Sequence, residues 1–376
     1  MVVGINLLFL IPGKVGGTET YSRELVKALA IDKSDNHYVV FVNKEASNWE
    51  LPENSKILKV ICPVAASNRL NRYLFEQFYF PFLLGSYKVE VLHSFGYVGP
   101  LITFCKHVVT IPDINFVGHG SSMPRRKRIL LGFMVKATAI CSNKIITISE
   151  FSRSEILKYL NVTKEKVRVI HLASFIDGNI AKSIVTYDRF ETQRIRQKFN
   201  TGDNYLLAFS SLNAHKNIPA LVLAYANIQK KTNCKLVLVG NILNTDLIHR
   251  LIDENKMQDF ISVTGYVSDL EIANLLSGAR LFIFPSFYEG FGLPLLEAQS
   301  VGTCVICSDR GSLPEIGSDS VEYFDPSSIE NMSKNILQLL NTPIRIAELQ
   351  KKGFENVKHF SWTRTATETL AVYQLL

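Results

Sequence analysis

The 376-residue chain is long enough for two or three domains, and its 47% hydrophobic and 20% charged residues give the composition of a globular protein with ample material for a core. Its formal net charge of +7, from 41 basic and 34 acidic residues, suits a phosphorylated ligand or an anionic surface, but it is too small to indicate a nucleic-acid-binding protein. No apolar run reaches the roughly 18 residues that a membrane-spanning helix needs.

The first ten residues are apolar, but neither a basic leader nor a small-residue cleavage site accompanies them. They are therefore interpreted as a first buried strand and not as a signal peptide. We expect a cytoplasmic protein that could also contact the inner face of the cell membrane.

Twelve short apolar runs with the length of strands follow one another along the chain. Those of the first half are Ile5–Ile11, Tyr38–Val42, Val89–His93, His107–Ile111, Lys144–Ile148 and Val167–Leu172. Those of the second half are Leu206–Ser210, Lys235–Val239, Ile261–Thr264, Leu281–Pro285, Thr303–Cys307 and Val321–Phe324. Helical patterns fall between them, among them Glu19–Ala30, Asn217–Lys230, Asp269–Leu276 and Ile329–Leu340.

This β-α alternation predicts parallel sheets covered by helices. Two sets of strands predict an α/β protein with two Rossmann-like, doubly wound domains that face a central cleft, where ligands of such sheets bind. The predicted boundaries are residues 1–175 for the first domain, 176–203 for a polar linker, 204–358 for the second domain and 359–376 for a final helix.

Most of the six cysteines lie inside apolar runs, which suits buried free thiols. Cys304 and Cys307 form a C-x-x-C sequence, but residues three apart on a strand point to opposite faces. A shared metal ion or disulfide is therefore not expected, and no other His and Cys spacing is typical of a metal site.

The segment with the most chemical information runs from Glu289 to Glu297 and reads E-G-F-G-L-P-L-L-E. Gly290 and Gly292 allow positive φ and a close approach of a ligand to the backbone, and Pro294 suits the first position of a helix. The unpaired N–H groups and the dipole of a helix start favour an anion such as a phosphate. We expect both carboxylates near this point, with Glu297 in the first helical turn. The alternative is a plain loop and a helix that favours Glu297 through its dipole.

This segment resembles the signature of the retaining, nucleotide-sugar-dependent glycosyltransferases of the GT-B fold, family 4 type. The resemblance implies that Glu289 binds hydroxyls of the transferred sugar and that Glu297 binds the ribose hydroxyls of the nucleotide. It also implies that the last helix packs back on the first domain. The diphosphate and the sugar would contact the backbone of Gly290, Phe291, Gly292 and Leu293.

Loops after the first strand of each half add to the resemblance. The first departs from the G-x-G-x-x-G spacing of NAD-binding proteins, but it resembles the Gly-Gly loop of the family, so that Gly16 and Gly17 would approach the donor diphosphate and the acceptor. A plain tight turn is the alternative. In the second loop, Ser210–Asn217, Lys216 matches the phosphate-binding Lys of the family and would stabilise the leaving group. Ser211 stands where the family often has an Arg, and it could donate one hydrogen bond to the diphosphate.

Further positions match the family in part. The backbone near Val267 resembles the turn that binds the nucleobase, and segments 149–152 and 311–315 also match family patterns. Asp113 is retained from a His-Asp pair, but Pro112 replaces the His that contacts the donor sugar. We expect Asp113 either in the site or as a helix cap, and His119 either as a substitute for the missing His or as an exposed loop residue.

The resemblance implies a retaining hexosyltransferase that uses a nucleoside diphosphate sugar, GDP-mannose-like or another hexose donor, and a saccharide or lipid-linked acceptor bound by the first domain. Bacterial surface polysaccharide is the expected pathway. A front-face displacement without metal or other cofactor is implied, with Lys216 and helix N-termini neutralising the diphosphate. Pro112 and Ser211 keep open a non-catalytic nucleotide-sugar-binding partner. A nucleotide-sugar epimerase is a further alternative, which the two-Glu motif disfavours.

A basic cluster, Arg125–Arg128, precedes the apolar run Ile129–Val135, and Arg69 and Arg72 precede another apolar run. Such a combination can bind anionic lipid, at roughly 1 kcal/mol per basic residue. The alternative is a solvated basic turn before a buried helix.

Overall fold

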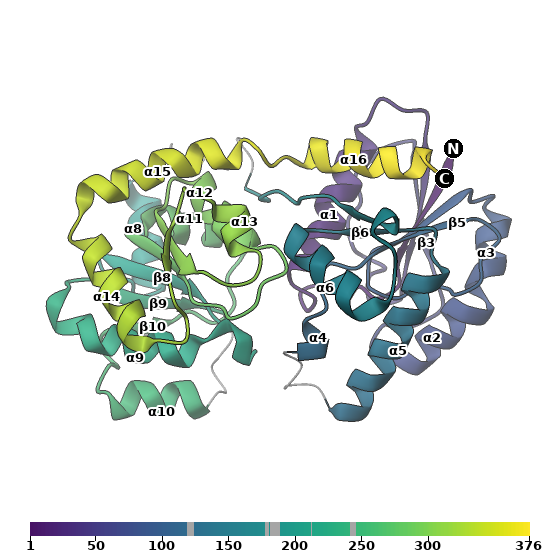
Figure 1. Ribbon diagram of the computed structural model, residues 1–376. Helices are drawn as coiled ribbons and strands as arrows, with labels where there is room; N and C mark the ends of the chain where they lie inside the picture. The colour runs from purple at the N-terminus through teal and green to yellow at the C-terminus, as the bar shows by residue number, and fades with distance from the viewer. Residues whose placement is uncertain (119–123, 177–179, 181–188, 212, 241–245) are drawn as a thin grey trace. The chain divides into compact units, whose positions relative to one another are not determined.

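The computed structural model describes residues 1–118, 124–176, 180, 189–211, 213–240 and 246–376. The chain separates into two compact units, each with its own sheet (Figure 1). Unit 1 comprises Met1–Leu172 and Ser361–Leu376, and unit 2 comprises Ala173–Phe360. The prediction of two α/β domains with parallel sheets is confirmed.

Unit 1 is built on a seven-stranded parallel sheet with the order β3-β2-β1-β4-β5-β6-β7. Its central strands are buried along nearly their whole length, as expected for a parallel sheet covered on both faces. The strands are β1 (Val2–Leu7), β2 (His37–Val42), β3 (Ile57–Ile61), β4 (Val91–Ser94), β5 (Lys106–Thr110), β6 (Lys144–Thr147) and β7 (Val167–Val169).

Helices flank this sheet and connect its strands (Figure 1). They are α1 (Gly17–Ala30), α2 (Arg69–Phe78), α3 (Phe80–Ser86), α4 (Asn115–Gly118), α5 (Arg125–Cys141), α6 (Glu150–Leu160), the 3-10 helix η1 (Lys164–Lys166) and α16 (Trp362–Gln374). Helix α16 packs on α1. Nδ1 of the buried His93 forms a 2.6 Å hydrogen bond with the hydroxyl of Tyr373, which fixes this last helix to the sheet of unit 1.

Unit 2 is built on a six-stranded parallel sheet with the order β10-β9-β8-β11-β12-β13. The chain starts at the centre with β8, adds strands on one side, and then returns to add β11 on the other side of β8. The strands are β8 (Tyr205–Phe209), β9 (Lys235–Val239), β10 (Ile261–Val263), β11 (Leu281–Phe284), β12 (Val305–Ser308) and β13 (Glu322–Phe324).

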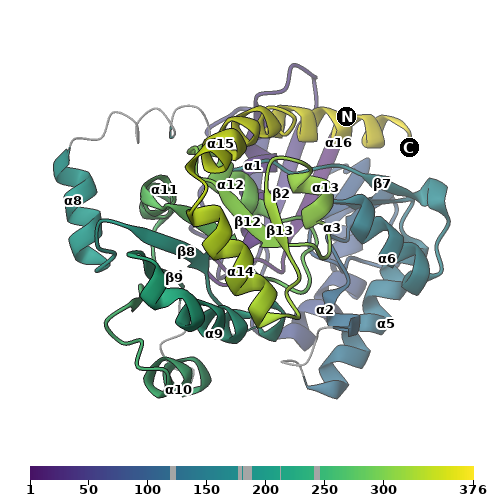
Figure 2. The ribbon, with the colours of Figure 1, turned by 60° about the vertical axis from the view of Figure 1, so that its left-hand side comes forward.

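The helices of unit 2 cover both faces of its sheet (Figure 2). They are α8 (Arg189–Lys198), η2 (Ala214–Lys216), α9 (Ile218–Ile228), η3 (Gln229–Lys231), α10 (Asp246–Glu254), α11 (Asp269–Gly278), α12 (Leu293–Ser300), α13 (Leu313–Gly317), α14 (Ile329–Leu340) and α15 (Pro343–Val357). One core cluster joins the sheet to α9 and α14 through residues such as Leu206, Leu221 and Ile336.

Two elements differ from the sequence-based prediction. Strand β3 was not predicted, because as an edge strand it leaves Leu58 and Ile61 half exposed and lacks a buried apolar pattern. The predicted linker contains helix α8, which packs on α11 and buries Ile195, while Phe199 just after it is also buried. Few side chains of α8 face the core, so most of its residues are polar. This polar composition is why the sequence suggested a linker.

Candidate active site

The segment from Glu289 to Glu297 forms the connection between β11 and α12. Gly292 takes a φ of 105° and is the residue before the helix, which therefore begins at Leu293. Two details of the sequence-based prediction are wrong: Pro294 is the second helical residue, and Glu297 lies beyond the first turn. The left-handed conformation of Gly292 sets this start, since a residue with a Cβ atom rarely adopts it.

Lys216 and Glu289 form an ion pair, with 2.7 Å between Nζ of the lysine and Oε1 of the carboxylate. Their side chains are 25% and 12% exposed, so the pair is largely screened from water but accessible from one side. The ammonium group also lies 5.5 Å from the centre of the Phe284 ring. The N–H of Phe287 donates to the carbonyl of His215 at 2.7 Å, which holds the two loops together.

The sheet topology explains why these two residues meet. Strands β8 and β11 are neighbours, and Lys216 follows the first while Glu289 follows the second. Because β8 continues to β9 on one side and β11 to β12 on the other, this is the point where the strand order reverses. Open α/β sheets bind ligands at the carboxyl ends of the strands at such a point.

Glu297 is buried, with 7% of its surface exposed. Burial raises the pKa of its carboxyl group to about 8, the negative charge of Asp269 adds to this rise, and the positive charge of Lys216 opposes it. A buried carboxyl group whose proton is held near neutral pH is a typical feature of a binding or catalytic site. Both predicted carboxylates thus lie within the electrostatic reach of Lys216.

The turn that contains Val267 leads into helix α11. Val267 is buried while Tyr266 is 84% exposed, and Ser268 begins the helix with a capping box that it completes with Glu271. The negative charge of Asp269, the first residue of α11, helps to raise the pKa of Glu297. The predicted nucleobase turn therefore lies in the neighbourhood of the predicted ribose-binding carboxylate.

Sequence reasoning gave no role to the loop after β12, yet this loop supports the site. The hydroxyl of the buried Ser312 donates to the carbonyls of Glu289 and Phe291, at 3.0 and 2.8 Å. Gly311 has a φ of 65°, and a Cβ atom there would lie 2.8 Å from the backbone N and O of Glu289. The sequence held one sign of this role. Gly311 and Ser312 follow the end of a strand, in a segment that resembles the family.

The side chains of two predicted donor-binding residues, Phe291 and Ser211, have contacts within unit 2. The ring of Phe291 is buried against Phe360, so its side chain belongs to the core. The hydroxyl of Ser211 accepts from the N–H of Asn213 at 3.2 Å and shapes its own loop. The diphosphate contacts of Ser211 and of the backbone from Gly290 to Leu293 stay predictions.

Three predicted residues lie in unit 1. Gly16 takes a φ of 57° just before α1, and Gly17 is the first residue of that helix. Both are exposed, and a Cβ atom on Gly16 would meet nothing within 4 Å, so the space beside this loop is open. Asp113 accepts hydrogen bonds from the hydroxyl of Tyr97 at 3.0 Å and from the N–H of Asn115 at 3.1 Å. His119 lies outside the described residues.

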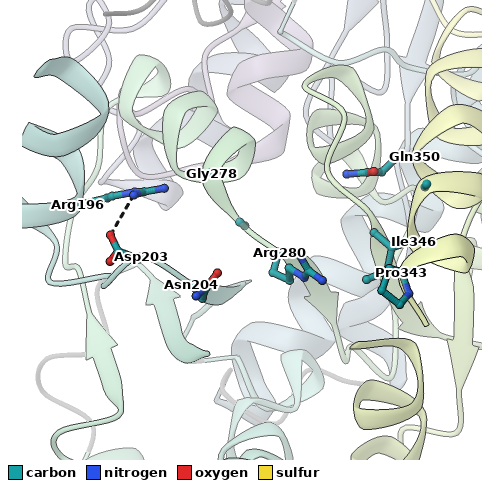
Figure 3. A pocket seen from close by; sticks show the side chains of 10 residues that line it. Arg196, Asp203, Asn204, Gly278, Arg280, Pro343, Ile346 and Gln350 are labelled. Carbon is teal, nitrogen blue, oxygen red and sulfur yellow. Dashed lines mark hydrogen bonds and ion pairs between the residues drawn. The ribbon is translucent and has the colours of Figure 1, made fainter. Parts of the chain in front are cut away.

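A polar pocket of about 420 Å³ lies elsewhere in unit 2 (Figure 3). Arg196, Asp203, Asn204, Arg280 and Gln350 are among its lining residues. Asn204 and Arg280 stand just before β8 and β11, so the pocket is at the amino ends of the strands, opposite to Lys216 and Glu289. Because α/β sheets bind their ligands at the carboxyl ends, we do not assign the donor to it.

The described residues contain neither a metal-binding group of side chains nor a helix that could span a membrane. Within them, no three His, Cys, Asp or Glu side chains are grouped so that they could hold a metal ion. Among their helices, none combines the length and the apolar character that crossing a membrane requires. The expectation of a reaction without metal stays a prediction.

Comparisons with known proteins agree with the geometry. The family described as Glycosyl transferases group 1 matches residues 189–358, and Glycosyltransferase Family 4 matches residues 15–173. O-antigen chain mannosyltransferase B of Escherichia coli is 30% identical over 385 residues, which cover 96% of each chain. A Mycolicibacterium hassiacum protein, MMP alpha-(1->4)-mannosyltransferase, is 28% identical over 246 residues, which cover 64% of this chain and 56% of that protein.

Solved structures share the architecture. Sucrose-phosphate synthase from Thermosynechococcus elongatus superposes with a TM-score of 0.78 at 19% identity, over 100% of this chain and 98% of that one. Anabaena HepE in complex with UDP and glucose gives a TM-score of 0.75 at 14% identity, over 100% of both chains. These likenesses show a GT-B fold. The family matches over both units and the 30% identical relative establish that the chain belongs to the group 1 glycosyltransferases.

Proposed function

We propose that the protein transfers a hexose, with retention of the anomeric configuration, from a nucleoside diphosphate sugar to a saccharide or lipid-linked acceptor in polysaccharide biosynthesis. The observation that carries the proposal is the Lys216–Glu289 ion pair at the carboxyl ends of two neighbouring strands, with the buried Glu297 nearby. Mannose is the first candidate sugar, since several relatives, including those from Escherichia coli and Mycolicibacterium hassiacum, are named mannosyltransferases.

The chemistry of the proposal follows from the charges. Nucleoside diphosphate leaves with additional negative charge, and the ammonium group of Lys216 neutralises it together with the start of α12. The carboxylate of Glu289 accepts hydrogen bonds from sugar hydroxyls and holds Lys216 in position before the donor binds. Glu297 accepts hydrogen bonds from the ribose. The acceptor hydroxyl attacks the anomeric carbon from the face that the diphosphate leaves, and the diphosphate takes its proton.

The test is a transfer assay with GDP-mannose, UDP-glucose and dTDP-glucose, each with and without a saccharide or lipid-linked acceptor. We expect acceptor-dependent release of the nucleoside diphosphate with one donor, and NMR of the product to show the anomeric configuration of that donor. Lys216→Ala and Glu289→Gln should each lower kcat by about 100-fold or more, as removal of a preorganised charge or donor does in other sites.

Matched variants separate this effect from loss of fold. Lys334→Ala and Glu254→Gln change the same residue types on the exposed surface of unit 2 and should keep the parent rate. All four variants should keep their melting temperature within a few degrees. Parent activity in Lys216→Ala or Glu289→Gln would remove that residue from the site.

A non-catalytic nucleotide-sugar-binding protein is the second candidate, favoured by Pro112 and Ser211 in place of the His and Arg of many relatives. Tight donor binding without turnover for any donor and acceptor would support it. Isomerisation of the donor without an acceptor would instead indicate an epimerase.

A further inference from the structure

Helix α2 exposes a stripe of apolar side chains and buries two charged ones. Leu70, Leu74 and Phe78 repeat every four residues along one stripe and are 65%, 48% and 71% exposed. Arg72 and Glu76, on the other side, are 8% and 2% exposed. A helix on the surface of a water-soluble domain normally has the reverse arrangement.

The inward side of α2 cannot exchange places with the outer stripe. Asn6 of β1 donates from Nδ2 to Oε1 of Glu76 at 3.4 Å, and Nε of Arg72 lies 3.9 Å from Oε2 of the same carboxylate. Because turning the helix would separate these buried groups, the apolar stripe stays directed outward. Arg72 is thus not part of a basic surface, which corrects the expectation that it joins Arg69 there.

Helix α5 adds a second set of exposed apolar residues and the basic cluster. Ile129, Leu130 and Phe133 are 63%, 50% and 67% exposed, so the alternative of a basic turn before a buried helix is wrong for these positions. The preceding residues 125–127 are all basic and exposed. Helix α5 contains five basic residues and no acidic one.

Helices α2 and α5 both contact the segment at Gly99. Gln77 of α2 and Thr138 of α5 both form hydrogen bonds with Gly99, and Tyr73 packs against the same core cluster as Leu131 and Met134. Figures 1 and 2 both show α2 and α5 side by side. The segment after Gly99 contributes Phe104, which is 75% exposed and whose ring lies 6.1 Å from that of Phe82 in α3.

We call this surface the outer face and define it by Leu74, Phe78, Phe82, Phe104, Leu130 and Phe133. The chain around it is strongly positive. Residues 54–149 contain 12 Lys and Arg and three acidic residues, a net charge of +9, whereas the whole chain carries +7. Of the three acids, Glu76 is buried. A surface that combines exposed Phe and Leu with Arg and Lys matches the interface of an anionic bilayer.

We propose that the outer face docks unit 1 on an anionic lipid bilayer, with its apolar side chains in the interface and the bases at residues 125–127 against lipid phosphates. A second copy of the chain is the main rival. In a symmetric dimer, however, this face would meet itself, and the cluster of positive charges would repel its own copy. The bilayer supplies the missing negative charge.

The test is co-sedimentation of the full chain with phosphatidylcholine vesicles that contain 30 to 40% phosphatidylglycerol, compared with pure phosphatidylcholine, in roughly 0.05 and 0.5 M salt. We expect binding to the anionic vesicles that weakens at high salt. Arg125→Glu with Arg126→Glu should lower the partition coefficient at least tenfold, because each basic residue contributes roughly 1 kcal/mol. Phe78→Glu with Phe133→Glu should lower it similarly.

Matched control variants lie on unit 2. Ile344→Glu changes a side chain that is 85% exposed, and Lys230→Glu with Lys231→Glu reverses two exposed bases. Both should bind vesicles like the parent, and all variants should keep the parent melting temperature. The assay needs neither donor nor acceptor, so its outcome is independent of the proposed function.

Two results would overturn the proposal. One is equal binding to neutral and anionic vesicles, or parent-like binding by both outer-face variants. The other is a concentration-dependent dimer in light scattering that Phe78→Glu with Phe133→Glu abolishes while no vesicle binding occurs, since this would assign the outer face to a second copy.

Discussion

At the scale of single residues, the site depends on how four ionisable groups share a small volume. Lys216 forms an ion pair with Glu289. At longer range its positive charge lowers the pKa of Glu297, which the negative charge of Asp269 raises. The sequence places Lys216 and Glu289 at the ends of strands, so their general location was predictable. Their direct contact was not, because it depends on loop conformations that only the packed sheet defines. The burial of Glu297 was not predictable either, because it depends on the elements that pack around α12.

The free energy of unfolding should depend on pH through Glu297. Its folded pKa of about 8 lies above the ordinary value of 4.5, so the unfolded chain loses this proton first as pH rises. The contribution of Glu297 to stability is therefore greatest below pH 4.5, falls between pH 4.5 and about 8, and is constant above that. Glu297→Gln should remove this fall and be more stable than the parent at pH 8.5, by on the order of a few kcal/mol. Urea unfolding of both proteins at pH 5, 7 and 8.5 measures it.

The same variant should show the opposite effect on nucleotide binding. If ionised Glu297 accepts hydrogen bonds from ribose, binding expels its proton below pH 8, and affinity for the nucleotide rises from pH 6 to 8. Glu297→Gln should bind roughly tenfold more weakly at pH 8 and lose the pH dependence. Calorimetry in two buffers of different ionisation enthalpy would detect the released proton. Equal proton release in parent and variant would disconnect Glu297 from the nucleotide.

At the scale of elements, the alternation of apolar runs with helical patterns was sufficient to predict most strands and the parallel sheets. What it could not supply is support between loops. Ser312, after β12, holds the backbone of Glu289 and Phe291, after β11, although 21 to 23 residues separate them in the chain. A lone Ser in a loop carries no periodicity, so only the neighbouring positions of β11 and β12 in the sheet reveal its role.

Ser312→Ala should lower kcat more than it changes KM for the donor. Loss of the hydroxyl removes a hydrogen bond worth about 1 kcal/mol and frees the Glu289 turn to shift, and small displacements of site residues can cost up to about 100-fold in rate. Ser300→Ala is the control, because its hydroxyl donates to the carbonyl of Leu296 in the same unit at 2.7 Å without touching the turn. Steady-state kinetics with the active donor measure both. Equal losses in the two variants would argue against a positioning role for Ser312.

At the scale of the whole molecule, the positive surface and the candidate active site lie in different units. The positive stretch 54–149 and the outer face lie in unit 1, whereas Lys216, Glu289 and Glu297 lie in unit 2. This distribution was only partly predictable. The overall charge of +7 conceals the local excess of +9, and the exposed positions of Phe78 and Phe133 follow from which side of each helix meets the sheet, which an apolar run does not specify.

Because each unit has its own sheet and core, we expect two transitions in differential scanning calorimetry, and only one of them should respond to nucleotide. A nucleoside diphosphate at about 100 times its Kd should add roughly 2.7 kcal/mol to the stability of unit 2. Tyr373→Phe identifies the other transition, since it leaves Nδ1 of the buried His93 without the hydroxyl that lies 2.6 Å away. That loss should cost unit 1 roughly 1–3 kcal/mol, which lowers its midpoint by about 2–4 °C per kcal/mol. If the nucleotide instead raised the transition that Tyr373→Phe lowers, the donor site could not belong to unit 2 alone.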